Sequence, residues 1–374
     1  MFWIMMIVEV LIAFFIGTVC FDIVHYSFHK CLKSKNKWLR SIASWHNAHH
    51  RFFSSSLMIQ LEFSRLNLVH HAAIEYAVQV IGTFFCYLFL QPIAITFAIL
   101  IETLLFINVW LSNGRDLHHR SYTILPSYRG GPFVTADYHA LHHIYPNYFF
   151  SSYIKFFDYI FGTSLPLVGK HIAMTGASGA LGSQMKKLLE KEGAIVTTLK
   201  FGVDYTYQQY DQLQVPLSQA DILFLCHGSK YDFAQQANCD SYIRIIELYK
   251  SAKITKLVPP EIWAVGSEIE CHPCFGIKKI QIYAKSKRNY AKAGRYYFHQ
   301  RDIQYRHLVH SAFISSMGPG LMSAKFAAMV TLMLLKRGFK YIPVTYTGFA
   351  YLNYFRFLIA KFRLNRTSPT YFRR

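Results

Sequence analysis

Long apolar stretches alternate with basic, histidine-containing segments in the first half of the chain. Residues 1–21 are almost wholly apolar, with Glu9 as the only charge, and residues 66–112 form a second apolar block that is broken at Gln91-Pro92. A membrane-spanning helix needs about 20 mostly apolar residues. The pattern therefore predicts one span at the start of the chain and two further spans joined by a tight hairpin.

Flanking residues indicate how these spans are used. The first stretch has no basic segment before it and no small-residue cleavage site after it, so we interpret it as a membrane helix and not as a signal peptide. Residues 22–65 hold seven Lys or Arg against two acidic residues, and Arg115, Arg120 and Arg129 follow the third span. By the positive-inside rule, both segments face the cytoplasm. We expect a multi-pass membrane protein with its active sites on the cytoplasmic face.

The hydropathy pattern changes at Gly169. A predicted strand at 171–175 is followed by a glycine-rich turn, a helix at 181–192 and a second strand at 194–199, and a third strand lies at 221–226. Strands that alternate with helices are typical of a parallel α/β sheet. The expected fold is an α-helical membrane domain over residues 1–168, followed by an α/β Rossmann-like domain over residues 169–374.

Composition narrows the choice of partners. The chain is 52% hydrophobic and 17% aromatic, and its formal net charge is +20. Such a charge favours anionic lipid headgroups or anionic cofactors, and no nucleic acid is expected because no nucleic-acid motif accompanies it. The seven cysteines have no disulfide-framework spacing, which indicates a reducing compartment, and Cys271-His-Pro-Cys274 is interpreted as a loop with free thiols.

Three histidine groups carry the candidate chemistry of the first domain. Residues three and four apart lie on one face of a helix, so the imidazoles within each group can converge on a metal ion. Imidazole binds zinc, copper, iron and nickel, and this many nitrogens suffice for two ions. The predicted ligands are His25, His29, His46, His49, His50, His119, His139, His142 and His143.

These groups also resemble a known family. The motifs HxxxH, HxxHH and Asp137-Tyr-His-x-Leu-His-His143, followed by Asn147-Tyr148, Asp158 and Phe161-Gly162-Thr163, are similar to those of the fatty acid hydroxylase and sterol desaturase superfamily. The resemblance covers about residues 5–165. It implies a membrane di-iron site that uses O2 and an external electron donor to oxidise a C–H bond of a membrane lipid.

Polar residues inside the apolar block are candidate supporting groups. Intramembrane ionisable side chains are functional candidates. Glu102 is predicted to orient a histidine ligand, whereas His70 and His71 are interpreted as lying at the membrane interface.

The second domain contains a dinucleotide-binding pattern. The turn Gly176-Ala-Ser-Gly-Ala-Leu-Gly182 joins the first predicted strand to a helix, where backbone N–H groups hold a pyrophosphate. Tyr283 and Lys287 are one helical turn apart, and a nearby ammonium lowers the pKa of a phenol that acts as acid or base. The predicted cofactor-binding residues are Gly176, Ser178, Gly179, Leu181, Gly182, Lys200 and Lys287.

Together these motifs resemble short-chain dehydrogenases/reductases over about residues 169–345. The resemblance implies that Tyr283 is the proton donor or acceptor and that Lys287 binds the ribose and tunes Tyr283. It also implies that Ser267 orients the substrate oxygen and that Asn238 supports a proton relay. The second strand ends at Lys200 and not at an acidic residue, which favours NADP(H) over NAD(H). Only 62 residues separate Gly176 from Asn238, so a strand–helix unit is expected to be shortened or missing.

The combined prediction is a bifunctional lipid-modifying oxidoreductase: two iron ions support hydroxylation of a lipid C–H bond, and an NAD(P)-dependent site interconverts the alcohol and the carbonyl. Alternatives are a lipid desaturase or aldehyde-processing enzyme on the same scaffold, and a membrane-anchored NAD(P)-binding sensor with a structural metal site. The aromatic and basic segment 346–364 is expected to lie at a membrane surface. The sequence leaves the oligomeric state, the lipid substrate and the direction of the dehydrogenase step open.

Overall fold

The computed structural model describes residues 1–231, 233–253, 257–275 and 277–364. It divides into two compact units, Met1–Leu165 and Pro166–Arg374, and each unit is described by itself. Part of the basic C-terminal tail, residues 365–374, lies outside the described residues.

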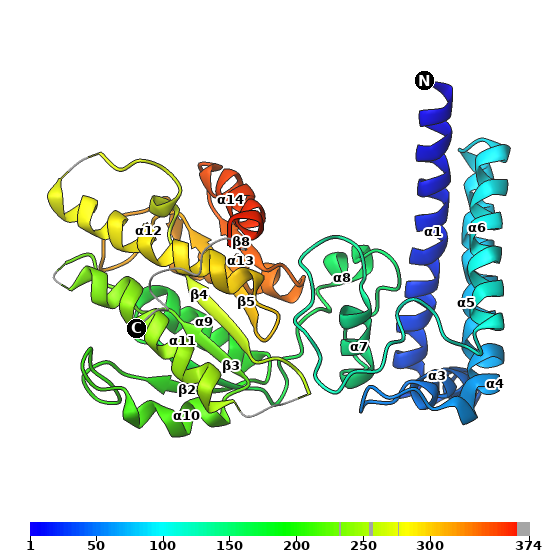
Figure 1. Cartoon of the computed structure of the whole chain (residues 1–374), viewed down its shortest axis with the longest axis horizontal. Coiled ribbons are helices and arrows are strands. Elements are labelled where there is room, and N and C mark those ends of the chain that lie inside the picture. The colour runs from blue at the N-terminus through cyan, green and yellow to red at the C-terminus, as the bar shows by residue number, and fades with distance from the viewer. Residues whose placement is uncertain (232, 254–256, 276, 365–374) are drawn as a thin grey trace. The chain divides into compact units, whose positions relative to one another are not determined.

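Three long helical segments lie side by side in the first unit (Figure 1). They are α1 (Phe2–Cys31), the run containing α5 (Ala73–Phe84), and α6 (Pro92–Leu111). The predicted hairpin lies at Gln91-Pro92, where Pro92 occupies the first turn of α6. Proline has no backbone N–H, and the N–H groups of the first turn have no partner within the helix, so no helical hydrogen bond is lost. Two of these helices, α1 and α6, are long and apolar enough to cross a membrane.

The middle helical run differs from a simple span. It starts with the short helices η2 (Leu61–Phe63) and α4 (Ser64–Asn67), continues through a π-turn, η3 (Leu68–Ala72), and ends after α5 in η4 (Phe85–Leu88). It packs closely on α1, because a Cβ atom on Gly82 would lie 3.1 Å from the Cα atom of Gly17. Small residues permit this close approach between membrane helices.

Short helices carry most of the remaining histidines of the two groups, and His119 lies in the irregular segment between α6 and α7. The segments α2 (Lys37–Ala43), η1 (Ser44–His46) and α3 (Asn47–Phe52) follow α1, and α7 (Ala136–Ile144) and α8 (Phe156–Phe161) end the unit. The chain after α7 is tied to α1 by Asp22, whose Oδ1 accepts hydrogen bonds from the backbone N–H of Ser152 (2.9 Å) and from its hydroxyl (2.7 Å). This contact brings α7 close to the histidines of α1.

The second unit is built on a parallel sheet of β1 (His171–Thr175), β2 (Ile195–Leu199), β3 (Ile222–Leu225), β4 (Glu261–Val265), β5 (Gln304–His310) and β8 (Tyr341–Val344). The strand order is β2-β1-β3-β4-β5-β8 and every described pairing in the sheet is parallel. The order reverses between β1 and β3, as in doubly wound nucleotide-binding folds. The expected α/β Rossmann-like fold is confirmed.

Helices and short segments surround this sheet. The helices are α9 (Ala180–Lys191), α10 (Gln214–Gln219), α11 (Ser241–Ala252), α12 (Lys278–His299), α13 (Ala324–Lys336) and α14 (Phe349–Leu364). The shorter pieces are η5 (Asp211–Leu213), η6 (Gln236–Asp240), η7 (Glu268–Glu270), β6 (Phe313–Ile314) and β7 (Met322–Ser323). Only η5 and α10 connect β2 to β3 in the described chain, and β2 is an edge strand, which accords with the expected shortening.

The last helix, α14, has one buried and one exposed face. Ala350, Asn353 and Phe357 are buried, whereas Leu352 and Phe355 remain 65% and 57% exposed. The buried positions are three and four residues apart, as one helical face requires. The expected placement of this segment at a membrane surface stays a prediction.

Candidate functional site

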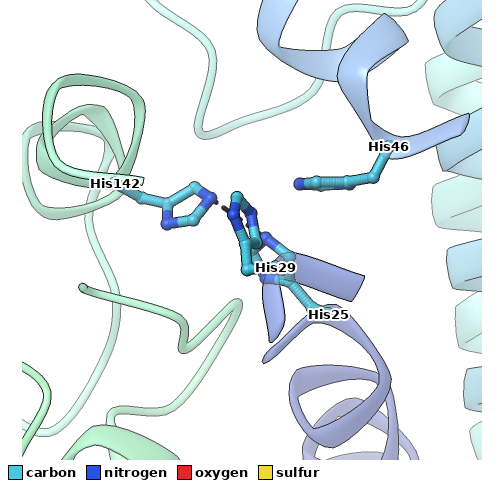
Figure 2. A group of neighbouring side chains, drawn as sticks. All are labelled: His25, His29, His46 and His142. Atoms are coloured by element: carbon cyan, nitrogen blue, oxygen red, sulfur yellow. Dashed lines mark hydrogen bonds between the residues drawn. The ribbon is translucent and has the colours of Figure 1, made fainter. Parts of the chain in front are cut away.

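Two groups of four histidines gather in the first unit. His25, His29, His46 and His142 form one group, which Figure 2 shows, and His49, His119, His139 and His143 form the other. Within each group one ring nitrogen of every residue lies within 4.8 Å of the others, and all eight side chains are buried. Of the histidines in the motif HxxHH, His46 belongs to one group and His49 to the other, so this motif contributes to both groups.

The hydrogen bonds of His25 and His142 fix which nitrogens face each other. His25 Nδ1 lies 3.2 Å from the carbonyl oxygen of Phe150, and His142 Nδ1 lies 2.8 Å from that of Tyr148. A carbonyl oxygen only accepts, so each Nδ1 carries the proton. The two Nε2 atoms, which are 3.0 Å apart, therefore present lone pairs to each other when both rings are neutral.

Facing lone pairs fit a metal ion between them. With a metal–nitrogen distance of ~2.1 Å, two ligands at a right angle have nitrogens ~3.0 Å apart, and two at the tetrahedral angle ~3.4 Å. The Nε2 atoms of His119 and His139, and those of His139 and His143, are 3.2 Å apart. Both groups therefore have the dimensions of a ligand set around one ion.

Unpartnered nitrogens support the same conclusion. Within the described part of the chain, the Nε2 atoms of His46 and His49 are both buried, and neither has a hydrogen-bond partner. His49 Nδ1 lies 3.2 Å from Asn67 Oδ1. An amide oxygen also only accepts, which leaves His49 Nε2 as a lone pair. Burial lowers the pKa of His142 to about 4, so this imidazole is neutral near pH 7, the form that binds metal.

A strained turn presents the two carbonyl acceptors. Phe149, between Tyr148 and Phe150, has a φ of 60°, a conformation that is unfavourable for a bulky residue. Its N–H donates to the carbonyl oxygen of Thr163 (2.9 Å). Asp158 accepts from the N–H groups of Phe150 and Ser151, at 3.0 Å each. The motifs that follow His143 thus hold the turn that orients His25 and His142: Tyr148 lies in the turn, and Asp158 and Thr163 accept hydrogen bonds from its backbone.

His50 and His71 contact both groups of histidines. The His50 ring lies 5.1 Å from His29 in the first group and 4.8 Å from His143 in the second, centroid to centroid. The His71 ring stacks on His49 at 3.6 Å and lies 5.1 Å from His46. His50, a predicted ligand, belongs to neither four-histidine group; its Nε2 lies 3.3 Å from that of His29, and its role as a ligand stays a prediction.

The interpretation of His71 as an interfacial residue is wrong. It is buried, with 7% of its surface exposed, because the π-turn of η3 places it beside the histidines. Glu75 Oε2 lies 3.5 Å from its Nε2. Glu102, in contrast, accepts a hydrogen bond from Thr83 (2.5 Å), three helical turns beyond His71. Among the described residues, neither Glu102 nor Glu75 has a hydrogen bond or ion pair with a member of the two four-histidine groups, so their contacts do not support the predicted role of Glu102 in orienting a ligand.

In the second unit, the carboxyl ends of the strands open into a cavity of about 1290 Å³. The glycine-rich turn and all the predicted cofactor-binding and catalytic residues line it. Gly176 has a φ of 68°, and a Cβ atom on Gly182 would lie 2.1 Å from the carbonyl oxygen of Gly176. Both glycines are therefore needed to form the turn, whereas Gly179 has only that oxygen near its Cβ position, at 3.3 Å.

The four predicted catalytic residues are brought together at this cavity. Ser267 hydrogen-bonds Tyr283. Lys287 Nζ donates to the carbonyl oxygen of Val265 (3.0 Å). The Nδ2 of Asn238 donates to the carbonyl oxygen of Ser229 (2.6 Å) and to Ser286 Oγ (3.1 Å). A Cβ atom on Gly228 would touch Asn238 and approach Lys287 Nζ to 3.9 Å, so Gly228 lets these groups meet.

The predicted direction of the Tyr283 pKa shift is wrong. Burial raises the pKa of this phenol, and the hydrogen bond with Ser267 offsets the rise only in part. Burial also lowers the pKa of Lys287, to about 8. Both shifts arise because a low-dielectric site disfavours the charged form of each group.

Comparison with known proteins identifies the first unit. Residues 11–163 match the fatty acid hydroxylase family. These residues form a fatty acid hydroxylase domain. The match spans both histidine groups, and the chain is a lipid-modifying oxidoreductase with a membrane-associated domain.

Relatives extend the comparison beyond this domain. The chain is 27% identical over 299 residues to a monoglucosyldiacylglycerol epimerase from Synechocystis, covering 68% of this chain and 72% of that protein. Because the fatty acid hydroxylase domain spans less than half of the 374 residues, this alignment reaches into the second unit.

Solved structures of short-chain dehydrogenases also match. One from Burkholderia cenocepacia, in complex with NADP, is 12% identical with a TM-score of 0.42 and covers 55% of this chain and 100% of that one. One from Serratia marcescens is 16% identical with a TM-score of 0.42 and covers 50% and 100%.

Proposed function

We propose that the two units act on the same lipid: the fatty acid hydroxylase domain hydroxylates a C–H bond, and the second unit interconverts the resulting alcohol with its carbonyl by hydride exchange with NADP(H). The observation that carries this proposal is the pair of buried four-histidine groups with facing Nε2 lone pairs. Outside a metal site, so many buried, unpaired imidazole nitrogens would cost several kcal/mol.

The residues of each group suit one iron ion. His25, His29, His46 and His142 would hold the first, and His49, His119, His139 and His143 the second. Bound there, two iron ions would supply O2-dependent oxidation of a C–H bond, with electrons from an external donor. The chain's own contribution is orientation. Phe150 and Tyr148 fix two rings through their carbonyl oxygens, and Asp116 Oδ1 lies 2.8 Å from His119 Nδ1, as supporting partners of metal-binding histidines do.

At the second site Tyr283 would exchange the proton. The Gly176–Gly182 turn would hold NADP(H), which when bound would supply hydride exchange at the carbinol carbon. As the C–H bond breaks, the hydroxyl proton passes to the phenolate of Tyr283 and a C=O bond forms. Ser267, which hydrogen-bonds Tyr283, is placed to hold the same oxygen. In the opposite direction Tyr283 would return the proton to the carbonyl oxygen.

Epimerisation of a lipid headgroup is a second candidate function. It is favoured by the relative from Synechocystis, which is named for that activity and aligns over both units. The hydride site suits it: oxidation of a carbinol to a ketone, followed by return of the hydride to the opposite face, inverts the carbon and regenerates NADP+. No net oxidant is consumed in this reaction.

Lipid mass spectrometry under isotopically labelled O2 tests the proposal. Cells that produce the protein should contain a lipid with one labelled oxygen, or the carbonyl formed from it, and cells without the gene should lack both. Epimerisation predicts a different result: a lipid of unchanged mass and altered headgroup stereochemistry, with no label. Unlabelled, unaltered lipids in producing cells would contradict both functions.

A further inference from the structure

The wall of the cavity beyond Ser267 consists of hydrogen-bond acceptors. It is formed at the carboxyl ends of three adjacent strands: Glu268 follows β4, His310 and Ser311 end β5, and Thr347 follows β8. All four line the cavity that contains Tyr283. None of them belongs to the predicted catalytic set or to the glycine-rich turn.

Glu268 is a carboxylate surrounded by hydroxyl groups. Only 6% of its surface is exposed. Its Oε2 accepts from Ser311, and its Oε1 accepts from Thr345 and Thr347. Each hydroxyl has one proton, so donation to Glu268 leaves its oxygen as an acceptor only. A carboxylate has about four lone-pair positions, and one of those on Glu268 remains for a ligand.

His310 adds an acceptor with no partner. Its Nε2 lies 2.8 Å from Thr331 Oγ1, and that hydroxyl donates to the carbonyl oxygen of Ala327 (2.7 Å). Thr331 must therefore accept from Nε2–H, which leaves Nδ1 as a lone pair. This Nδ1 is buried and has no hydrogen-bond partner among the residues that the structure describes, and the side chain is only 3% exposed.

A wall of this kind needs a ligand that donates hydrogen bonds. Amines and other cations donate, but Lys287 and Lys230 line the same cavity, and Lys230 Nζ lies 5.9 Å from the centre of the Tyr283 ring. Two ammonium groups disfavour a cation at that place. A simple fatty alcohol has a single hydroxyl, which Tyr283 and Ser267 would already hold. Neutral hydroxyl groups beside the reacting carbon satisfy both requirements.

We infer that Glu268, His310, Ser311 and Thr347 form a subsite for the neighbouring hydroxyls of a polyhydroxylated, sugar-like headgroup. The inference rests on the hydride transfer proposed at Tyr283 and names the class of its substrate. The headgroup's reacting carbinol lies at Tyr283, and its adjacent hydroxyls donate to Glu268 and His310. Loss of such a contact leaves a buried acceptor unpaired, so the subsite discriminates against alcohols that lack those hydroxyls.

NADP+-dependent oxidation by the full-length protein in detergent tests this inference. The two probes are octyl glucoside, which is polyhydroxylated, and a secondary octanol, which is not. For Glu268→Gln we expect the ratio of kcat/KM for octyl glucoside to that for the octanol to fall about tenfold to hundredfold, the range for a lost hydrogen bond to a charged group. Thr347→Val should lower the ratio less, and Glu192→Gln, at a half-buried ion pair with Lys336, serves as the control.

The outcomes separate this inference from the proposed function. Oxidation of both probes with an unchanged ratio in Glu268→Gln would overturn the subsite and leave the hydride transfer standing. Oxidation of neither probe by the parent protein would overturn the hydride transfer, and the subsite with it. Loss of NADP+-induced thermal stabilisation in Glu268→Gln would assign this wall to the cofactor's amide and overturn the headgroup subsite.

Discussion

The residues around His25 and His142 explain why the late motifs of the fatty acid hydroxylase domain contain more than histidines. Tyr148 and Phe150 contribute carbonyl oxygens, Phe149 adopts the left-handed conformation between them, and Asp158 holds the turn. The contacts are made largely by backbone atoms. A change in backbone conformation at this turn would therefore release two metal-facing rings at once.

Removal of one histidine should affect one ion. We expect His142→Ala to lower the iron content of the purified full-length protein by about half, since His142 belongs to one of two separate four-histidine groups and a lost ligand weakens binding strongly. Elemental analysis measures this. The control is His171→Ala, an exposed histidine at the start of β1. One equivalent of zinc, unaffected by His142→Ala, would contradict a di-iron site.

The pKa of Lys287 predicts a pH dependence for alcohol oxidation. Oxidation needs the Tyr283 phenolate, whose pKa is raised by burial, so the rate should rise with pH. Lys287 is charged below pH 8 and neutral above it, because burial lowers its pKa to about 8. Loss of the ammonium removes a charge that stabilises the phenolate, so the rise should flatten above pH 8.

Lys287→Arg provides the check on this assignment. Arginine stays protonated throughout, so initial rates of NADPH formation in this variant should continue to rise above pH 8, even if the rates are lower overall. A break near pH 8 that persists in Lys287→Arg would assign the titration to another group.

At the scale of secondary-structure elements, the glycine-rich turn between β1 and α9 combines two separate requirements. Gly182 is needed for the turn itself, because any Cβ atom there would collide with the carbonyl oxygen of Gly176, whereas Gly179 meets that atom only at 3.3 Å. Gly179 also lines the cavity. Gly182 is thus needed for the turn to fold, and Gly179 leaves room for a pyrophosphate.

These roles predict different results for two substitutions. Gly179→Val should fold with little change in melting temperature but lose the thermal stabilisation produced by NADP(H), because the side chain occupies the place of the pyrophosphate. Gly182→Ala should lower the melting temperature without cofactor, by a cost of about 1–3 kcal/mol for overpacking. Thermal scans of the full-length protein with and without NADP(H) measure both. A Gly179→Val variant that still responds as the parent does would place the cofactor elsewhere.

Much of this local structure could be predicted from the sequence, and the exceptions have physical causes. The periodicity predicted β1 and α9 to within one residue at either end, because strand, turn and helix are specified by adjacent residues. His71 was misinterpreted because a π-turn, which has no simple hydrophobic period, rotates it toward the histidines. The hydrogen bond between Thr83 and Glu102 depends on the packing of α5 against α6. The acceptor wall at Glu268 and His310 depends on strand order, which periodicity does not specify.

For the whole molecule, one chain carries both a site that would produce an alcohol and a site that would consume it. The units divide at residues 165 and 166. A lipid whose headgroup carries the alcohol leaves the membrane reluctantly, at about 0.8 kcal/mol for each buried methylene of its chains. A hydride-transfer site tethered to the proposed hydroxylation site would avoid this cost.

Tyr283→Phe tests whether the two sites act in this order. The substitution removes only the phenolic hydroxyl, so the metal content of the fatty acid hydroxylase domain should stay unchanged while proton exchange at the second site is lost. We expect the hydroxylated lipid to accumulate and the carbonyl product to fall by about tenfold or more, as for the loss of a general acid or base. Lipid mass spectrometry measures both species, with Tyr351→Phe, on the exposed face of α14, as the control. Accumulation of the carbonyl, or a lipid profile equal to that of the parent, would show that the product of the histidine site is not the substrate of Tyr283.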